Sequence, residues 1–364
     1  MDNRNRVYGL DILRAVAILI VLFTHSYGYS HLHFLGFIYK IIPDGVGLFF
    51  VLSGFLIGGI LLRTINKDSF TFKNLTNFWI RRWLRTLPAY YVVITILFAF
   101  QFLIHEQKSI YEYLQYYFFI QSIVDGTAKL YGESWSLCIE EWFYLLIPFA
   151  LFISIFFAPI NKRKIVFFWI LFTIVSVTIF RIYRMQFISN VSDWDTFSRR
   201  ALITRLDSIM YGFLGAYLSY YHHPIWQKKN SLFILGILFL FINSAYPFVT
   251  GFSFYSRYLY LSVQSLSVLF FLPKLNSIKN GNGKVFQAIT FISIISYSMY
   301  LLNGTPFHDL VIRALRKIGL PDSPFITYDW ARLIAFALWS FVGSWILYKY
   351  VETPMMNLRN RISK

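Results

Sequence analysis

Apolar segments of nearly membrane-spanning length constrain this 364-residue chain more than any other feature of its sequence. A helix needs about 20 mostly apolar residues to cross the hydrocarbon core of a bilayer. Ten segments meet that requirement: residues 9–28, 45–63, 87–105, 137–158, 165–183, 204–221, 231–249, 255–273, 286–303 and 329–350. They predict an all-α fold, a polytopic transmembrane bundle of about ten spans that forms a single domain over residues 1–364.

Composition supports a membrane protein rather than a soluble one. Charged residues make up 14% of the chain, against roughly 25% in a soluble domain. The segment 110–124 is apolar and aromatic but short, so it fits an interfacial or re-entrant element, or else an eleventh span. We expect the longer connections 106–136 and 304–328 to form a small cap.

The basic residues predict how the chain is oriented. With a cytoplasmic N-terminus, roughly twice as many Lys and Arg fall on the cytoplasmic side as on the other, as membrane topology requires. Both termini are therefore predicted to be cytoplasmic, with the chain in the plasma membrane. The loop 181–203 goes against this trend with four arginines. The net charge of +17 reflects topology rather than nucleic-acid binding, because it lies in short loops between apolar runs.

Charged side chains inside spanning helices are costly, so they are candidates for function. Arg14 and His25 in the first helix are eleven residues apart, which places them on one face about 16 Å apart. The same helix also contains Asp11. We expect the face that carries Arg14 and His25 to point into the bundle. Imidazole titrates near neutral pH, so His25 is a candidate general base. The alternative is a histidine that only hydrogen-bonds a neighbouring helix.

Two arginines precede the third apolar segment. Arg82 and Arg85 are three residues apart and share a helix face. Guanidinium groups suit phosphates, so the pair is a candidate anion clamp together with Arg14. The alternative is a topology signal that meets anionic headgroups.

Adjacent carboxylates open the fourth apolar segment. Glu140 and Glu141 point about 100° apart on a helix, so we expect different partners: one could orient His25 or pair with an arginine. A structural ion pair is the alternative.

Gly54 and Gly58 form a G-x-x-x-G pair, for which we expect helix packing. Further polar or aromatic side chains are substrate-binding candidates, with structural roles as the alternative: Trp135, Ser136, Tyr144, Arg205, Asp207, Tyr297 and Tyr300.

No metal site is predicted. The remaining histidines show no ligand spacing, and the single cysteine, Cys138, excludes a cysteine-based zinc site and an intramolecular disulfide.

Taken in order, these segments resemble the acyltransferase 3 family of membrane acyltransferases. The resemblance covers nearly the whole chain: an arginine, ten residues and a histidine (Arg14 to His25), Phe-Phe-x-Leu-Ser-Gly-Phe (Phe49 to Phe55), R-x-x-R (Arg82 and Arg85), the tryptophan-to-tyrosine motif (Trp135 to Tyr144) and a closing Glu-x-Pro (Glu352 to Pro354). Each motif alone is weak, but five in order are specific. Many relatives carry a histidine where this chain has Asn303, and some carry a C-terminal SGNH transferase domain, which this sequence lacks.

The resemblance implies transfer of an acyl group, usually acetyl, from cytoplasmic acyl-CoA to a hydroxyl of a carbohydrate or lipid-linked glycan. Arg14, Arg82 and Arg85 would hold the coenzyme A phosphates, and the thioester would lie near His25. Glu140 or Glu141 would orient the imidazole or stabilise its charged form; a covalent acyl-histidine is also compatible with the pattern.

Two other classes of protein fit part of the pattern. A multi-span transporter or flippase of a glycan or small anionic substrate also needs buried charges, but no inverted repeat is visible. A non-catalytic scaffold does not explain the burial of Arg14, His25, Glu140 and Glu141.

Overall fold

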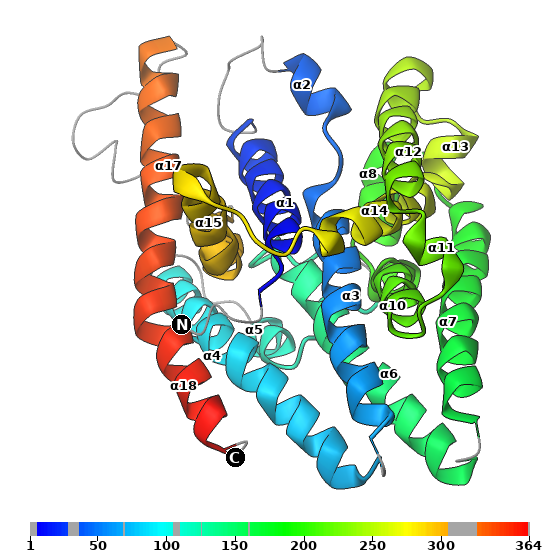
Figure 1. The fold of residues 1–364 in the computed structure, drawn as a ribbon. Helices are drawn as coiled ribbons and strands as arrows, with labels where there is room; N and C mark the ends of the chain where they lie inside the picture. Colours follow the sequence, from blue (N-terminus) through cyan, green and yellow to red (C-terminus); the bar gives the residue numbers. More distant parts are fainter. Residues whose placement is uncertain are drawn as a thin grey trace.

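The computed structural model describes residues 6–27, 36–67, 70–104, 110–124, 126–158, 161–304 and 326–362, and every regular element in these ranges is helical. Figure 1 shows the helices gathered into one bundle, with α1 near its middle and α7 and α17 on opposite flanks. The all-α prediction is confirmed. The elements are α1 (Tyr8–Tyr27), α2 (Gly36–Ile41), α3 (Gly45–Ile65), α4 (Phe72–Ile104), α5 (Ile110–Tyr117), α6 (Ser134–Phe157), α7 (Lys162–Met185), α8 (Val191–Trp194), η4 (Asp195–Arg199), α9 (Leu202–Arg205), α10 (Asp207–Tyr220), α11 (Pro224–Gln227), α12 (Lys229–Thr250), α13 (Phe254–Tyr258), α14 (Tyr260–Ser277), α15 (Gly283–Leu302), α17 (Ile326–Leu347), η5 (Tyr348–Glu352) and α18 (Thr353–Ile362).

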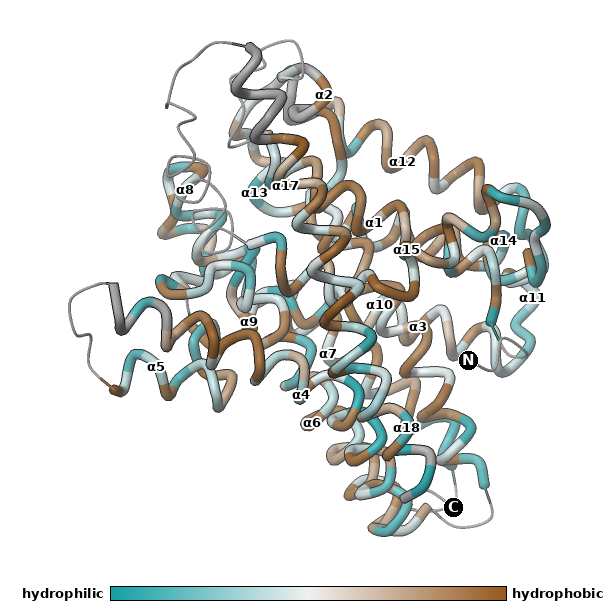
Figure 2. Tube along the Cα trace, turned by 90° about the vertical axis from the view of Figure 1, so that its left-hand side faces the viewer, coloured by the Kyte–Doolittle hydropathy of each residue, from teal (hydrophilic) through white to brown (hydrophobic). Residues whose placement is uncertain are grey.

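Six helices in the described ranges are long and apolar enough to cross a membrane. They are Tyr8–Ser26, Gly45–Ile65, Ser134–Phe157, Lys162–Met185, Gly283–Leu302 and Leu333–Arg359. Figure 2 shows hydrophobic residues along α1, α3 and α12 and hydrophilic residues around α11 and α18. The protein is therefore an integral, multi-pass membrane protein. Helices also occupy the other four predicted segments, but the count of ten stays a prediction, as does the orientation of the termini.

The segment 110–124 does not span as a helix. Its helical part, α5, has eight residues, which is about 12 Å of helix against a hydrocarbon core of about 30 Å. Residues 110–124 therefore do not form an eleventh helical span. Most of the other predicted cap segment, 304–328, lies outside the described residues.

The glycines of α3 allow the closest helix contact of the bundle core. A Cβ atom on Gly54 would lie 1.8 Å from the Ile209 carbonyl oxygen, and one on Gly58 would lie 2.4 Å from the Phe213 ring. On the facing helix, a Cβ atom on Gly212 would lie 1.9 Å from the Val51 oxygen. The predicted packing role of Gly54 and Gly58 is confirmed, because backbones approach this closely only where no side chain intervenes.

Helix α1 carries the two functional candidates into the bundle. It contacts α3, α14 and α15. Its Ala17 and Ile18 are fully buried, whereas Val16 and Leu19 are exposed on the outer side of the same helix. One face of α1 is thus fixed inward by packing, and Arg14 lies near one end of it and His25 near the other. We call these the arginine end and the histidine end.

Candidate functional site

A cavity of about 370 Å³ lies at the arginine end, between α1, α3, α4, α6 and α15. We call it the arginine cavity. Its charged lining consists of five arginines and two carboxylates: Arg6, Arg14, Arg63, Arg82, Arg85, Asp11 and Glu140. The three residues predicted to hold coenzyme A, Arg14, Arg82 and Arg85, therefore line one cavity although they come from two helices.

Only two of these arginines have carboxylate partners within the described residues. Arg6 forms an ion pair with Asp11 at 2.5 Å and also donates to Ser293. Arg82 lies 3.2 Å from Glu140. The other three make no ion pair in the part of the chain that the structure describes: Arg14, Arg63 and Arg85. The cavity thus has an excess of positive charge, which suits an anionic ligand such as a phosphate.

Tyr144 holds Arg82 in place. The Arg82 guanidinium donates to the Tyr144 hydroxyl at 2.5 Å and lies 4.1 Å from the centroid of its ring. The same hydroxyl donates to Glu140 at 2.8 Å and contacts Ser53. Trp79 fixes the backbone of Tyr144 through its indole nitrogen, at 2.9 Å. Tyr144 is therefore placed to orient an arginine of the cavity, although it was predicted to bind substrate itself.

The two adjacent glutamates have different partners, as their angular separation predicts. Glu140 accepts from Arg82 and Tyr144, and Glu141 accepts from Thr86 at 3.1 Å. Tyr297 donates to the carbonyl oxygen of the same Thr86, at 2.8 Å. Neither glutamate contacts His25 in the structure. The structure therefore does not support the hypothesis that one of them orients the imidazole, because Glu140 lines the arginine cavity.

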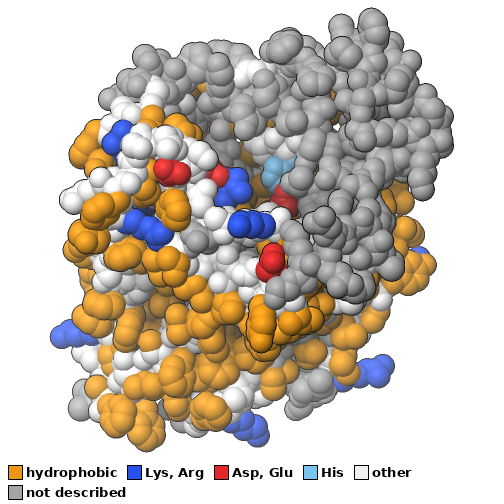
Figure 3. Space-filling model, turned by 180° about the vertical axis from the view of Figure 1, so that it is seen from behind, with side chains coloured by type: hydrophobic (Ala, Val, Ile, Leu, Met, Phe, Trp, Pro, Cys, Tyr) orange, Lys and Arg blue, Asp and Glu red, His pale blue; other side chains and the backbone are white. Residues whose placement is uncertain are grey.

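A second cavity, of about 690 Å³, lies at the histidine end, and we call it the histidine cavity. Its polar and aromatic lining comes from α1, α3, α6, η4 and α14, and includes His25, Asp44, Trp135, Asp195, Arg199, Arg200 and Tyr260. Figure 3 shows acidic, basic and histidine side chains gathered on one part of the molecular face, above a belt of hydrophobic side chains. His25 lines this cavity and not the arginine cavity, and the position of the thioester beside His25 stays a prediction.

Asn303 sets the orientation of the His25 ring. The amide nitrogen of Asn303 donates to the carbonyl oxygens of Met299 at 2.7 Å and Tyr300 at 2.9 Å. Its amide oxygen therefore faces His25 Nδ1, with which it forms a hydrogen bond. Because a neutral imidazole then carries its proton on Nδ1, Nε2 is left as the acceptor. That is the protonation state a general base requires.

Two arginines and two carboxylates of the histidine cavity pair with one another. Arg199 lies between Asp195, with which it forms an ion pair, and Asp44 at 3.6 Å. Arg200 lies 2.6 Å from Asp195. Burial by itself would raise the pKa of Asp195, but Arg199 and Arg200 outweigh it and lower the pKa below the usual value. Arg199 also lies 5.3 Å from the centroid of the Trp135 ring. This wall pairs charged groups with aromatic rings, the composition that suits a polyhydroxy ligand.

Arg205 and Asp207, predicted to bind substrate, line neither cavity. Both are fully buried. Arg205 forms an ion pair with Asp44 at 2.9 Å, and Asp207 forms one with Arg181 at 2.9 Å. These pairs join distant segments of the chain: one holds α9 against the start of α3, and the other holds α10 against α7. Their role in the structure is therefore architectural.

Sequence reasoning missed most of the histidine cavity. Asp44, Asp195, Arg199, Arg200 and Tyr260 were not among the predicted residues. One signal was available: the loop 181–203 carries arginines where topology disfavours them. In the structure two of those four arginines, Arg199 and Arg200, line the histidine cavity. Arg63 of the arginine cavity was counted only as a topology residue.

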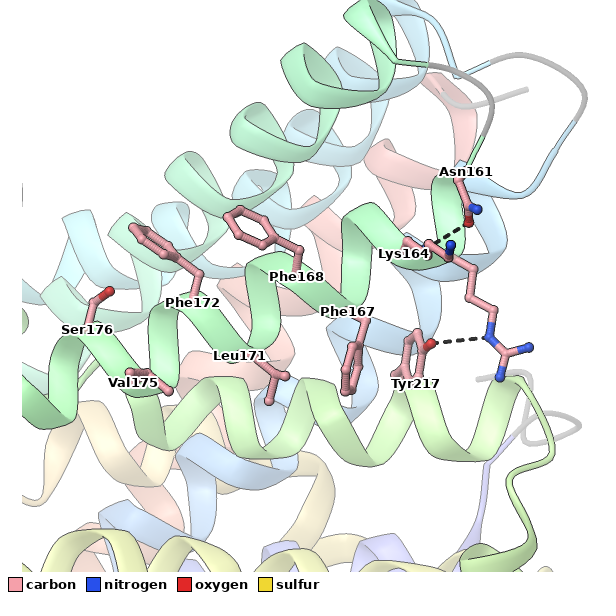
Figure 4. A pocket seen from close by; sticks show the side chains of 10 residues that line it. Asn161, Lys164, Phe167, Phe168, Leu171, Phe172, Val175, Ser176 and Tyr217 are labelled. Carbon is pink, nitrogen blue, oxygen red and sulfur yellow. Dashed lines mark hydrogen bonds between the residues drawn. The ribbon is translucent and has the colours of Figure 1, made fainter.

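A third recess, of about 650 Å³, lies on the outside of the bundle along α7. Figure 4 shows its aromatic wall, with Phe167, Phe168 and Phe172 on α7 and Tyr217 opposite, where Arg163 donates to the Tyr217 hydroxyl at 3.2 Å. The lining is mostly apolar apart from Asn161, Arg163, Lys164 and Ser176, and it shares no residue with the arginine cavity or the histidine cavity. It offers no reacting groups and is not part of the candidate site.

Among the described residues, no group of three or more His, Cys, Asp or Glu side chains could hold a metal ion. Cys138 is buried and its Sγ donates to the Phe119 carbonyl oxygen at 2.8 Å. Its thiol is thus used in packing α6.

Comparison with known proteins assigns the chain to a family. The profile described as an acyltransferase domain, of the acyltransferase 3 family, matches residues 7–349. A Staphylococcus aureus (strain COL) protein with the name of an O-acetyltransferase is 27% identical over 95% of this chain and 56% of its own length. The peptidoglycan O-acetyltransferase of Listeria monocytogenes is 33% identical over 40% of this chain and 24% of its own. A Bacillus subtilis protein named as a peptidoglycan O-acetyltransferase is 33% identical over 44% and 26%.

The first of these matches covers only about half the length of the relative. No solved structure matches the chain significantly. The profile match nevertheless spans almost all of the sequence and contains both cavities, together with Arg14, His25, Arg82, Arg85 and Glu140. The chain belongs to the acyltransferase 3 family.

Proposed function

We propose that this protein transfers an acyl group, acetyl in the first instance, from acyl-CoA to a hydroxyl of a carbohydrate or lipid-linked glycan. The observation that carries the proposal is the pair of cavities along α1. One has three arginines that make no ion pair with any described residue and could bind an anionic donor, and the other has an oriented imidazole for a hydroxyl acceptor. Relatives named as O-acetyltransferases, two of them of peptidoglycan, support a glycan as the acceptor.

The arginine cavity would receive the donor. Arg14, Arg82 and Arg85 would bind the phosphates of coenzyme A by charge-assisted hydrogen bonds. The pantetheine arm would then extend along α1 toward the histidine end. Because Arg82 is fixed by Glu140 and Tyr144, its guanidinium needs little reordering when the donor binds. These roles place the arginine end on the cytoplasmic side, where acyl-CoA is available, and both termini there as well.

His25 would act as the general base. The acceptor hydroxyl attacks the thioester carbonyl carbon, so that a C–O bond forms and the C–S bond breaks. His25 Nε2 takes the hydroxyl proton as the attack proceeds and returns it to the departing thiolate of coenzyme A. Asn303 keeps Nδ1 protonated and so supports the required tautomer. The atoms balance as acyl-CoA plus an alcohol giving an ester plus free coenzyme A.

The test of the proposed function uses cells that make the protein. The gene is deleted, and base-labile acetate is measured on the surface glycans of the deletion strain and of strains that carry the wild type or His25→Ala. We expect the acetate to fall on deletion and to return with the wild type only. Equal acetate in all strains would contradict the proposal, provided that both proteins are found in the membrane in equal amounts.

A further inference from the structure

The arginine cavity and the histidine cavity meet at a single layer of side chains. Val46 and Tyr300 line both cavities. No other described residue occurs in both linings. The proposed donor site and the proposed base are therefore separated in this structure by Val46 from α3 and Tyr300 from α15.

Hydrogen bonds hold Tyr300 across the boundary. Its hydroxyl lies 2.6 Å from Ser136 Oγ, which lines the arginine cavity, and donates at 2.9 Å to the carbonyl oxygen of Glu133, which lines the histidine cavity. Its ring meets Phe49 edge to face, with centroids 6.4 Å apart. A side chain that is fixed at its ring and at its hydroxyl closes the passage in the state described here.

A second aromatic contact extends the same layer. Phe50, which lines the arginine cavity, packs edge to face on Trp135, which lines the histidine cavity, with centroids 5.8 Å apart. The layer is thus apolar except for the Tyr300 hydroxyl and its partners. Such a layer keeps water that reaches His25 away from a thioester held beside Ser136 and Phe49.

The layer is also linked to the base. Asn303, which orients His25, donates to the Tyr300 carbonyl oxygen. Tyr300 and Asn303 therefore share the C-terminal end of α15, and movement of that end would displace the Tyr300 ring and the Asn303 contact to His25 together.

We propose that Tyr300 is a partition between a donor cavity and an acceptor cavity, and that its closed position protects bound acyl-CoA from hydrolysis until an acceptor hydroxyl occupies the histidine cavity. This inference rests on the proposed function. Tyr300 acts here by excluding water and by positioning the acyl group, and it takes no part in proton transfer.

The experiment needs no knowledge of the acceptor. Purified protein is incubated with acetyl-CoA alone, and free coenzyme A is measured as the thioester is hydrolysed. The variants are Tyr300→Ala, which removes the ring, and Tyr300→Phe, which removes only the hydroxyl bonds. Tyr90→Phe is the matched control, because the buried Tyr90 hydroxyl also donates to a backbone carbonyl, that of Tyr116 at 2.9 Å, but lines neither cavity. Acetyl-CoA affinity is measured for every variant by calorimetry.

We expect acceptor-independent hydrolysis to rise severalfold in Tyr300→Ala and less in Tyr300→Phe, with acetyl-CoA affinity unchanged and Tyr90→Phe equal to the wild type. Adding His25→Ala to Tyr300→Ala should abolish the gain, since water would then lack its base. Folded Tyr300 variants that bind acetyl-CoA and hydrolyse it at the wild-type rate, or more slowly, would overturn the partition. If the Tyr300→Ala variant does not fold, the Tyr300→Phe variant still tests the partition. If the wild-type protein binds no acetyl-CoA, that result would instead contradict the proposed function, and the partition with it.

Discussion

The two cavities lie at opposite ends of one face of α1, yet their charges are arranged differently. In the arginine cavity Arg14, Arg63 and Arg85 lack carboxylate partners within the described residues. In the histidine cavity Arg199 and Arg200 are paired with Asp195. Cations without carboxylate partners attract an anionic ligand such as a phosphate, whereas charges that are already paired do not require one. The comparison supports the proposal that the arginine cavity binds a highly charged donor and the histidine cavity a neutral or weakly charged acceptor.

The largest expected effect tests the histidine cavity. His25→Ala should lower acyl transfer by about 10²- to 10⁴-fold, because it removes the general base, while acetyl-CoA affinity stays at the wild-type value. Transfer and affinity are measured on the same purified samples. His223→Ala is the control, since His223 is exposed and only caps α11. Normal transfer by a folded His25→Ala protein would remove the base from the mechanism.

The next effect tests the arginine cavity. Arg14→Ala should weaken acetyl-CoA binding by about ten- to a hundredfold, as expected for the loss of one or more hydrogen bonds to a charged group. Arg14→Lys should lose less, because the charge is kept but the forked geometry is not. The control is Lys73→Ala, an exposed residue of α4 outside the cavity. Equal weakening by the control would mean that net charge alone governs binding.

A smaller effect tests how the base is held. Asn303→Ala should lower the turnover number up to about tenfold, the value of one hydrogen bond, with acetyl-CoA affinity unchanged. Asn303→Asp keeps an oxygen that can accept from His25 Nδ1, so it should retain more activity than the alanine variant. If both variants were equally active, the contact would have no part in orienting the imidazole.

The smallest effect concerns the charged wall of the histidine cavity. The pKa of Asp195 is lowered in the folded protein, so its ion pairs contribute stability above the unfolded pKa of about 4 and lose it as the pH falls through the folded pKa. The difference in melting temperature between wild type and Asp195→Asn should therefore stay constant from about pH 8 to pH 5.5 and narrow only below about pH 4. If the difference in melting temperature changed near pH 7, a group other than Asp195 would be responsible.

Much of the arginine cavity could be predicted from the sequence, and little of the histidine cavity could. Arg14, Arg82 and Arg85 lie in long helices, where residue spacing fixes the face. Arg14 and His25 also lie on one helix, α1, as predicted. In the structure they line two separate cavities, and nothing in their spacing shows that Val46 and Tyr300 lie between these cavities.

The residues of the candidate site that could not be predicted are positioned by contacts between distant segments of the chain. His25 and Asn303 are 278 residues apart, and Arg205 and Asp44 are 161 apart. No periodicity within a helix reports such a pairing. The acidic partners of Arg199 and Arg200 could be named in the sequence, but their position against α3 follows from the way η4 folds back into the bundle.

One measurement tests the central claim most directly: calorimetric titration of the purified wild type with acetyl-CoA, repeated with Arg85→Ala and at raised salt. The account predicts saturable binding that weakens in the variant and as salt screens the phosphate contacts. A folded wild type without saturable binding would contradict the account and favour transport of a glycan or small anion through the same two cavities.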